Sequence, residues 1–158
     1  MSLDAAAFRR ALGQFATGVT VVTTRDAAGH PLGLTVSAFC SVSLHPPLVL
    51  VCIDHRSEAN AAMRESGLFA VNVLAEGQEE VSRRFAAPGR AKLQGFELAE
   101  GKHGLPLVPG ALAHLECRIT ARHDEGDHTI LVAEVEMGAA RDERPLLYYR
   151  GGYAQLER

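Results

Sequence analysis

One short segment carries hydroxyl side chains on a single side. Thr35, Ser37, Ser41 and Ser43 fall on one parity of the numbering, so an extended chain presents them along the same edge. Small side chains lie among them, and these let a flat ring approach the backbone while hydroxyl and N–H groups bond its polar rim. The segment could therefore bind a planar heterocycle. A solvent-facing edge strand rich in Ser and Thr has the same pattern, and periodicity alone favours that simpler interpretation.

A second segment, residues 55–60, could bind an anion. It leads from an apolar run into the predicted start of a helix, where unpaired N–H groups and the helix dipole favour negative charge. Arg56 adds a positive charge beside that start. A helix that is simply capped by Ser57 explains the same residues without a ligand, so this motif alone does not establish a site.

Sequence motifs for the commonest catalytic mechanisms are absent. No GxGxxG follows a strand, and neither a P-loop motif nor a GxSxG nucleophile motif occurs. The seven histidines lack the spacing of a metal site, so we expect no metal. If the chain is an enzyme, we expect its chemistry to be carried by something other than a nucleophile or metal of its own, and an organic cofactor fits that expectation.

The elements that must position these segments are mainly strands. We expect helices over residues 3–15, 57–65 and 79–85. Ser2 and Ser57 are the predicted N-caps of the first two, and Gly67 lies just beyond the end of the second. We expect strands over residues 18–24, 32–37, 48–53, 68–74, 115–123, 128–137 and 146–149.

Two of these regions are informative about the fold. The run 48–53 is apolar without alternation, which predicts a strand buried on both faces. Residues 87–110 are rich in Gly and Pro and have few periodic apolar positions, so we expect a long irregular segment there, called the excursion below. Many strands joined by tight turns, with only short helices between them, predict a mainly β fold. We expect a closed barrel rather than a parallel sheet, in one domain over residues 1–158.

Composition argues against several classes of partner. Apolar residues make up 47% of the chain and charged residues 22%, with a formal net charge of -3, as in ordinary globular proteins. Nucleic-acid binding would need a clustered basic face, and no apolar run reaches the roughly 18 residues that span a bilayer. Three cysteines without a CxxC motif, and a start without the pattern of a signal peptide, lead us to expect reduced thiols in the cytoplasm.

Several short sequence stretches, taken together in their order along the chain, indicate a protein family more specifically than any one of them does. They are residues 8–24, GLTVSAFCSVS at 33–43, PPLV at 46–49, FAVNVL at 69–74, GDHT at 126–129 and YRGGY at 149–153. Together they span nearly the whole chain. On these stretches the sequence resembles the short-chain flavin reductase family, the reductase components of two-component flavin-dependent monooxygenases, including the 4-hydroxyphenylacetate type.

The resemblance implies an FMN-binding split β-barrel with short flanking helices, in which two subunits build two flavin sites at their interface. It also implies which residues contact the flavin. Thr35, Val36, Ser37 and Ala38 would line the isoalloxazine edge, and Cys52, Ile53 and Asp54 would follow the ribityl chain. Ser57 and Asn60 would meet the phosphate, and Arg84 and Phe85 would close over it. From composition alone, Cys52 would be a buried apolar residue without a redox role.

The resemblance places a histidine on the nicotinamide side of the site. His128 matches the family histidine that faces the nicotinamide, where an imidazole can bond the carboxamide and help hold the ring over the flavin. Without the resemblance, His128 is a polar residue that starts a strand after a turn. Tyr153 and Arg150 are weaker candidates for the same pocket.

The resemblance implies an enzyme that reduces FMN or FAD with NADH or NADPH by hydride transfer. Reduced flavin would then pass to a transient monooxygenase partner or to another acceptor. Two alternatives stay open at this point. One is an enzyme that holds FMN tightly and reduces a corrinoid or a ferric complex, and the other is a non-catalytic flavin-binding protein.

Overall fold

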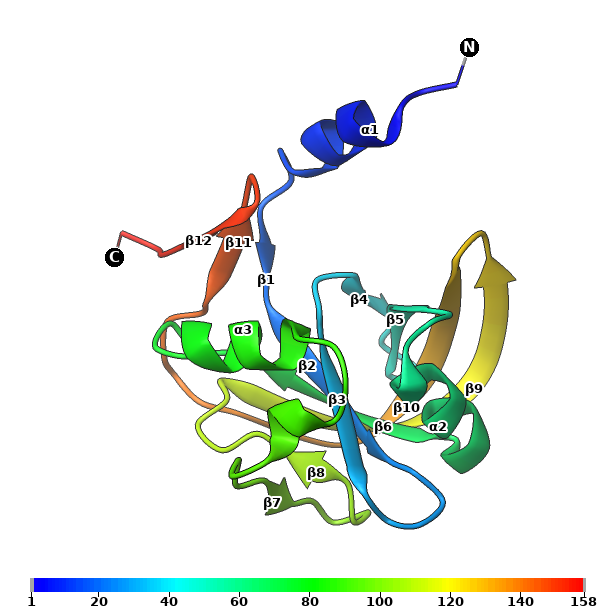
Figure 1. Cartoon of the computed structure of the whole chain (residues 1–158). Coiled ribbons are helices and arrows are strands. Elements are labelled where there is room, and N and C mark those ends of the chain that lie inside the picture. The colour runs from blue at the N-terminus through cyan, green and yellow to red at the C-terminus, as the bar shows by residue number, and fades with distance from the viewer. Residues whose placement is uncertain (1, 158) are drawn as a thin grey trace.

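A computed structural model describes residues 2–157, and its main feature is one large antiparallel sheet (Figure 1). The order of its seven strands is β3-β2-β6-β9-β10-β5-β4. Their bounds are β2 (Thr20–Arg25), β3 (Pro31–Val36), β4 (Phe39–Ser43), β5 (Leu48–Asp54), β6 (Leu68–Val73), β9 (Ala113–Glu125) and β10 (His128–Ala140). The helices are α1 (Ala5–Leu12), α2 (Glu58–Ser66) and α3 (Glu79–Ala86). The predicted mainly β fold is confirmed.

Smaller ladders accompany the main sheet. One comprises β1 (Thr17–Gly18), β11 (Leu147–Tyr149) and β12 (Gly152–Ala154), and the sequence pattern did not predict β12 as a strand. The predicted excursion contains a single turn of 3-10 helix, η1 (Ala91–Leu93), and the paired strands β7 (Ala99–Glu100) and β8 (Pro106–Leu107). In the main sheet β3 and β5 approach each other, but β3 and β4 are the edges of the ladder, so hydrogen bonds do not close it within residues 2–157.

The two predicted hairpins form as the sequence indicates. β2 pairs with β3 from Thr20↔Val36 to Arg25↔Pro31, and β9 pairs with β10 around the turn at Gly126. Asp26 stabilises the first turn, because its carboxylate accepts hydrogen bonds from the backbone N–H groups of residues 28 and 30, at 3.0 and 2.9 Å.

The core divides into two clusters on opposite faces of β2. Val22 packs with Ile53, Phe69 and others inside the curled sheet, whereas Val21 packs with Phe85 and others beneath α3. Successive side chains of a strand point to opposite faces, so β2 is buried on both. The prediction of two buried faces for the run 48–53 is wrong. In β5, Val49, Val51 and Ile53 are buried, but the alternate residues are partly exposed because no described element covers their face.

Helix α1 differs from its prediction in length and cap. It begins at Ala5 rather than residue 3, and its N-cap is Asp4 rather than Ser2, because the Asp4 carboxylate accepts a hydrogen bond from the Ala7 N–H at 2.9 Å. The helix projects away from the main sheet (Figure 1) and has no buried residue. Phe8, Leu12 and Phe15 are 55, 55 and 77% exposed.

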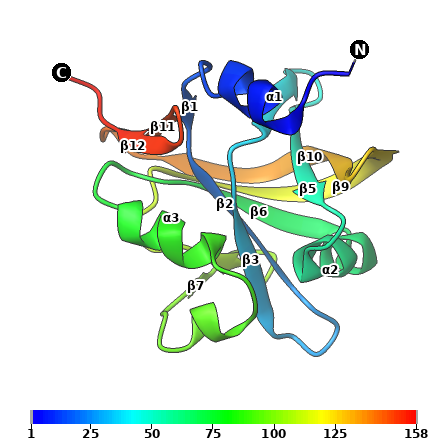
Figure 2. The ribbon, with the colours of Figure 1, turned by 45° about the horizontal axis from the view of Figure 1, so that its top comes forward.

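Helices α2 and α3 flank β3 on its two sides (Figure 2). Ser57 caps α2 as predicted, and Gly67 follows its last residue with a φ of 71°, in the left-handed region that favours glycine. Acidic residues start α3 and basic residues end it, which suits the helix dipole. In the part of the chain that the structure describes, no helix has the length and apolar character needed to cross a bilayer.

Candidate functional site

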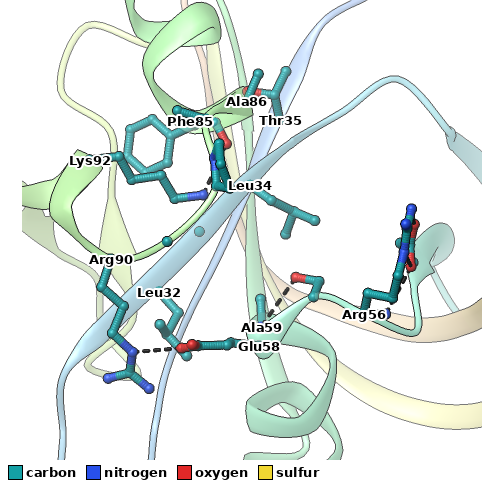
Figure 3. A pocket seen from close by; sticks show the side chains of 16 residues that line it. Leu32, Leu34, Thr35, Arg56, Glu58, Ala59, Phe85, Ala86, Arg90 and Lys92 are labelled. Carbon is teal, nitrogen blue, oxygen red and sulfur yellow. Dashed lines mark hydrogen bonds and ion pairs between the residues drawn. The ribbon is translucent and has the colours of Figure 1, made fainter.

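A pocket of about 580 Å³ lies over β3 (Figure 3). Leu32, Gly33, Leu34 and Thr35 of β3 form its floor, the start of α2 forms one wall, and the end of α3 with the following segment forms the other. The volume falls within the range of small-molecule sites. Four of the predicted flavin residues line it, namely Thr35, Asp54, Ser57 and Phe85.

The floor of the pocket is shaped by a glycine and a phenylalanine. A Cβ atom at Gly33 would lie 2.9 Å from Cε1 of Phe85, so the Phe85 ring occupies the space that a side chain would need. Phe85 is almost fully buried and packs edge-on against Phe96, with 5.3 Å between ring centroids. The Thr35 hydroxyl donates a hydrogen bond to the carbonyl of Ser82 at 2.6 Å, which joins β3 to α3. Sequence analysis overlooked Gly33.

The α2 wall carries polar groups at the helix start. The Ser57 Oγ accepts a hydrogen bond from the Ala59 N–H at 3.2 Å, and its own proton can still be donated to a ligand. Next to it, the Arg56 guanidinium bonds both carboxylate oxygens of Asp54, at 3.2 and 2.8 Å. These bonds hold the pKa of Asp54 well below its usual range. The charge that Arg56 was expected to offer an anion is therefore largely neutralised by its neighbour.

The opposite wall supplies two cations that sequence analysis did not assign to the site. The Arg90 Nε bonds the Glu58 carboxylate at 2.6 Å, and its Nη1 bonds Asp26 at 2.8 Å. The hydrogen bond from Arg90 is the main reason why the pKa of Asp26 falls to about 2. The Lys92 Nζ donates to the carbonyl of Phe85 at 3.1 Å, and burial lowers the Lys92 pKa. Both cations belong to the predicted excursion, and nothing in its pattern indicates which element it folds against.

Several predicted flavin residues have side chains outside this pocket. Val36 and Ile53 are buried in the core. Asn60 is also buried, and its amide donates to the carbonyls of residues 53 and 54 and to the Thr129 hydroxyl, so it holds the end of β5 in place. Cys52 is on the outer face of β5, where burial raises its thiol pKa. Any contact of these residues with a ligand in this pocket would have to come from the backbone.

The Arg84 side chain contacts the segment that follows α3. Its guanidinium donates to the backbone carbonyls of Lys92 and Gln94 and lies over the Phe96 ring, 5.1 Å from the centroid. The side chain therefore fixes the segment after α3 to the helix and is not among the groups that line the pocket.

Ser37 and Ala38 lie between β3 and β4 and are exposed. The carbonyl of Ala38 accepts a hydrogen bond from the Cys52 N–H at 3.0 Å, which links this turn to β5. The turn directly follows Thr35 and Val36 at the end of the pocket floor. A ring that extended beyond the floor would meet small side chains and backbone groups here.

A second hollow, of about 390 Å³, lies on the other side of the residues that follow α3. It shares Ala86 and Ala87 with the first pocket and is lined by Arg83 and Tyr153, among others. The Tyr153 hydroxyl shares a hydrogen bond with Ser82 Oγ at 2.7 Å, and the Arg83 guanidinium lies 5.0 Å from the centre of the Tyr153 ring. Tyr153 is thus next to the first pocket but is not one of its lining residues.

His128 is the first residue of β10 and pairs in register with Asp54 of β5. Its Nδ1 lies 2.7 Å from the Asp127 carboxylate, and 42% of the side chain is exposed. The imidazole therefore stands at the α2 end of the site, oriented by an acidic neighbour and open to solvent. Within residues 2–157, no three His, Cys, Asp or Glu side chains are grouped so that they could hold a metal ion.

Comparison with known proteins gives a consistent result. Residues 12–157 match the model of the flavin reductase like domain. The FMN reductase (NADH) SmoA of Agrobacterium fabrum is 46% identical over 151 residues, covering 96% of this chain and 86% of that protein. The reductase subunit HsaB of a flavin-dependent monooxygenase from Rhodococcus jostii is 43% identical over 157 residues, covering 99% and 80%.

A solved structure shows the same likeness in three dimensions. The NADH:FAD oxidoreductase SgcE6 of Streptomyces globisporus, in complex with NAD and FAD fragments, superposes with a TM-score of 0.91 at 36% identity. The match covers 99% of this chain and 97% of that one.

Proposed function

The chain belongs to the flavin reductase family, and from that premise we propose that the pocket over β3 is the place where it binds and reduces flavin. The protein is a flavin reductase, and we propose NADH as its hydride donor because relatives are named FMN reductase (NADH) and NADH-dependent flavin reductase. A bound flavin supplies an acceptor for the hydride of the nicotinamide. The observation that carries the assignment is the shape of the pocket, in which a floor without a side chain at Gly33 meets a wall that carries Arg90 and Lys92.

The residues fit a flavin at both ends. A planar ring needs a flat, partly apolar bed, which Leu32, Gly33 and Leu34 offer. A phosphate needs cations and hydroxyl or N–H donors, which Ser57, Arg90 and Lys92 offer at the walls. The exposed turn at residues 37–38 extends the bed at the end of β3 and suits the polar rim of the ring.

The protein's own contribution to catalysis is alignment. Holding two rings in reacting geometry can lower a barrier by several kcal/mol without a proton-transfer group. We assign His128 to the nicotinamide side, because it is exposed, stands beside Asp54 at the pocket's edge and is oriented by Asp127. Tyr153 and Arg150 belong to the neighbouring region and are secondary candidates for contact with the nicotinamide nucleotide.

We further propose that reduced flavin leaves the protein to serve a monooxygenase partner. The names of the relatives support this, since HsaB is the reductase subunit of a flavin-dependent monooxygenase. They also leave the choice between FMN and FAD to experiment, because one relative is named for FMN and another for FAD. Three free cysteines agree with a reducing compartment, and we expect the protein in the cytoplasm.

A steady-state assay tests this function against its alternatives. NADH oxidation by the purified protein should rise in proportion to added FMN or FAD until it saturates. Slow oxidation that is independent of free flavin would instead indicate a tightly held FMN and another acceptor, such as a corrinoid or ferric complex. Flavin binding without NADH oxidation would indicate a non-catalytic flavin-binding protein.

We also propose that two copies form a C2 dimer. Helix α1 exposes Phe8 and Leu12, and Phe15 is exposed just after it. Val42 of β4 and Leu44, which follows that strand, are also exposed. Exposed apolar side chains that gather on a projecting helix and an edge strand are typical of an interaction surface. The partly exposed face of β5 continues that surface. Light scattering at micromolar concentration should give twice the monomer mass, and a monomer mass would refute the dimer.

A further inference from the structure

Arg90 joins three separate elements at one end of the flavin pocket. It lies at the N-cap of η1, in the segment after α3. Its guanidinium bonds Glu58 at the first position of α2, and Asp26 at the turn between β2 and β3. Figure 3 shows the Arg90 and Glu58 side chains directed toward each other and joined by this ion pair, one from each wall of the pocket. The cation best placed at the mouth of the pocket is therefore held by two carboxylates.

We propose that Glu58 and Asp26 are built-in competitors of the flavin phosphate for Arg90. In this view Arg90 exchanges its bond to Glu58 for one to the phosphate when flavin binds, and returns to Glu58 when flavin leaves. The carboxylates thereby weaken the binding of phosphorylated flavins and favour release of the reduced product. The inference rests on the proposed function and concerns how tightly that site holds its substrate.

The other cations of the pocket are less suited to such an exchange. Arg56 makes a bidentate pair with Asp54, its neighbour in sequence, and also bonds that carboxylate through its backbone N–H. Lys92 is partly buried and bonds the carbonyl of Phe85, a group of the pocket wall itself. Arg90 alone among these three is paired across the pocket, with partners from two other elements.

The Arg90–Glu58 ion pair is weak enough for a phosphate to replace Glu58 as the partner of Arg90. The Arg90 side chain is 47% exposed and that of Glu58 is 62% exposed. Ion pairs that are this open to solvent are weak, because water screens the charges and two long side chains lose freedom. A phosphate carries more negative charge than a carboxylate and offers three acceptor oxygens to a guanidinium. The exchange therefore needs no rearrangement of buried structure.

The decisive variant is Glu58→Gln, which keeps the shape of the side chain and removes its charge. We expect FMN to bind about two- to fivefold more tightly, since the energy of one exposed pair is recovered. Riboflavin has no phosphate, and its affinity should stay unchanged. Arg90→Gln should weaken FMN by about threefold or more and again spare riboflavin. Both ligands can be titrated by isothermal calorimetry on the folded variants.

Direct repulsion between Glu58 and the phosphate would also make FMN bind more tightly to Glu58→Gln. The double variant Glu58→Gln with Arg90→Gln separates the two explanations. If Glu58 acts by occupying Arg90, the double variant should bind FMN as Arg90→Gln does. If Glu58 acts on the phosphate directly, removal of its charge should improve binding in both backgrounds, and that result would overturn the proposal.

A matched control uses another exposed pair. Arg141 and Glu143 are 48 and 51% exposed and lie outside the residues that line the pocket. Glu143→Gln should leave the affinities for FMN and riboflavin unchanged. An FMN affinity that is unchanged or weaker in Glu58→Gln, while NADH still reduces the flavin, would overturn this inference alone. A wild type that binds neither FMN nor FAD would overturn the proposed function together with it.

Discussion

Gly33→Ala should damage the flavin pocket and the core at the same time. The added Cβ would lie 2.9 and 3.0 Å from two carbons of the Phe85 ring and 3.2 Å from Cγ2 of Thr23. Carbon atoms that are not bonded prefer about 3.5–4.0 Å, so the ring must retreat by roughly 0.5–1 Å. Phe85 is 1% exposed and packs on Phe96, which leaves little room for that movement.

The cost of this change follows from the packing. Overpacking of a tight core typically costs about 1–3 kcal/mol, and for a domain of this size each kcal/mol lowers Tm by roughly 2–4 °C. We therefore expect Tm to fall by about 2–12 °C in a thermal melt. Because Gly33 and Phe85 both line the pocket, FMN affinity should fall by roughly tenfold, which corresponds to about 1.4 kcal/mol of lost contact.

Two further variants make the prediction strict. A Cβ at Gly77 would meet no atom within 4 Å, so Gly77→Ala should leave Tm and FMN affinity almost unchanged. Phe85→Leu removes ring atoms that the new Cβ would strike, so its effect and that of Gly33→Ala should be less than additive in the double variant. If Gly33→Ala and Gly77→Ala gave the same Tm and the same affinity, the close packing of Phe85 on Gly33 would be refuted.

Three other changes test the remaining roles. Ser57→Ala should weaken the binding of FMN by roughly tenfold and that of riboflavin hardly at all in calorimetric titrations. It should also lower the free energy of unfolding by about 1 kcal/mol, because the helix cap is lost. Equal effects on both ligands would contradict a phosphate contact. His128→Ala should raise KM for NADH more than the Kd for flavin, and a loss confined to flavin affinity would contradict its place on the nicotinamide side. Asp26→Asn should be less stable than the wild type at pH 5–7. This difference should vanish as the pH falls from 3.8 to about 2, because the folded-state pKa of Asp26 lies below its usual value; denaturation curves showing the same difference at pH 2.5 and pH 6 would contradict this.

Local signals predicted most elements of the fold. The β-branched run that forms β2 and the turn residue Asp26 produced the expected hairpin, because strand preference and turn chemistry act over a few residues. Ser57 was recognised as a cap for the same reason. The exposed outer face of β5 could not be foreseen in this way. Its apolar residues look the same whether another part of the chain or a second copy covers them.

The candidate site was predicted best where it lies on regular elements. Thr35 and Phe85 both line the pocket, because β3 and α3 are fixed by their own patterns, and their expected contacts with the flavin stay predictions. Ser37, Ala38 and His128 have positions compatible with their expected roles, and those roles stay predictions. The least predictable part was the wall that contributes Arg90 and Lys92, since an excursion without periodicity carries no signal of where it packs.

Arg84 and Arg90 show why residue type alone is an insufficient guide to such a wall. Both are arginines within one short stretch, and either could reach a phosphate. Arg84 bonds two backbone carbonyls and an aromatic face, contacts that a ligand could displace only by loosening the segment itself. Arg90 bonds Asp26, which its own turn holds in place, and Glu58, whose side chain is 62% exposed and can move away at little cost. An arginine bound to backbone therefore builds the site, whereas an arginine bound to an exposed acidic side chain such as Glu58 stays available to a ligand.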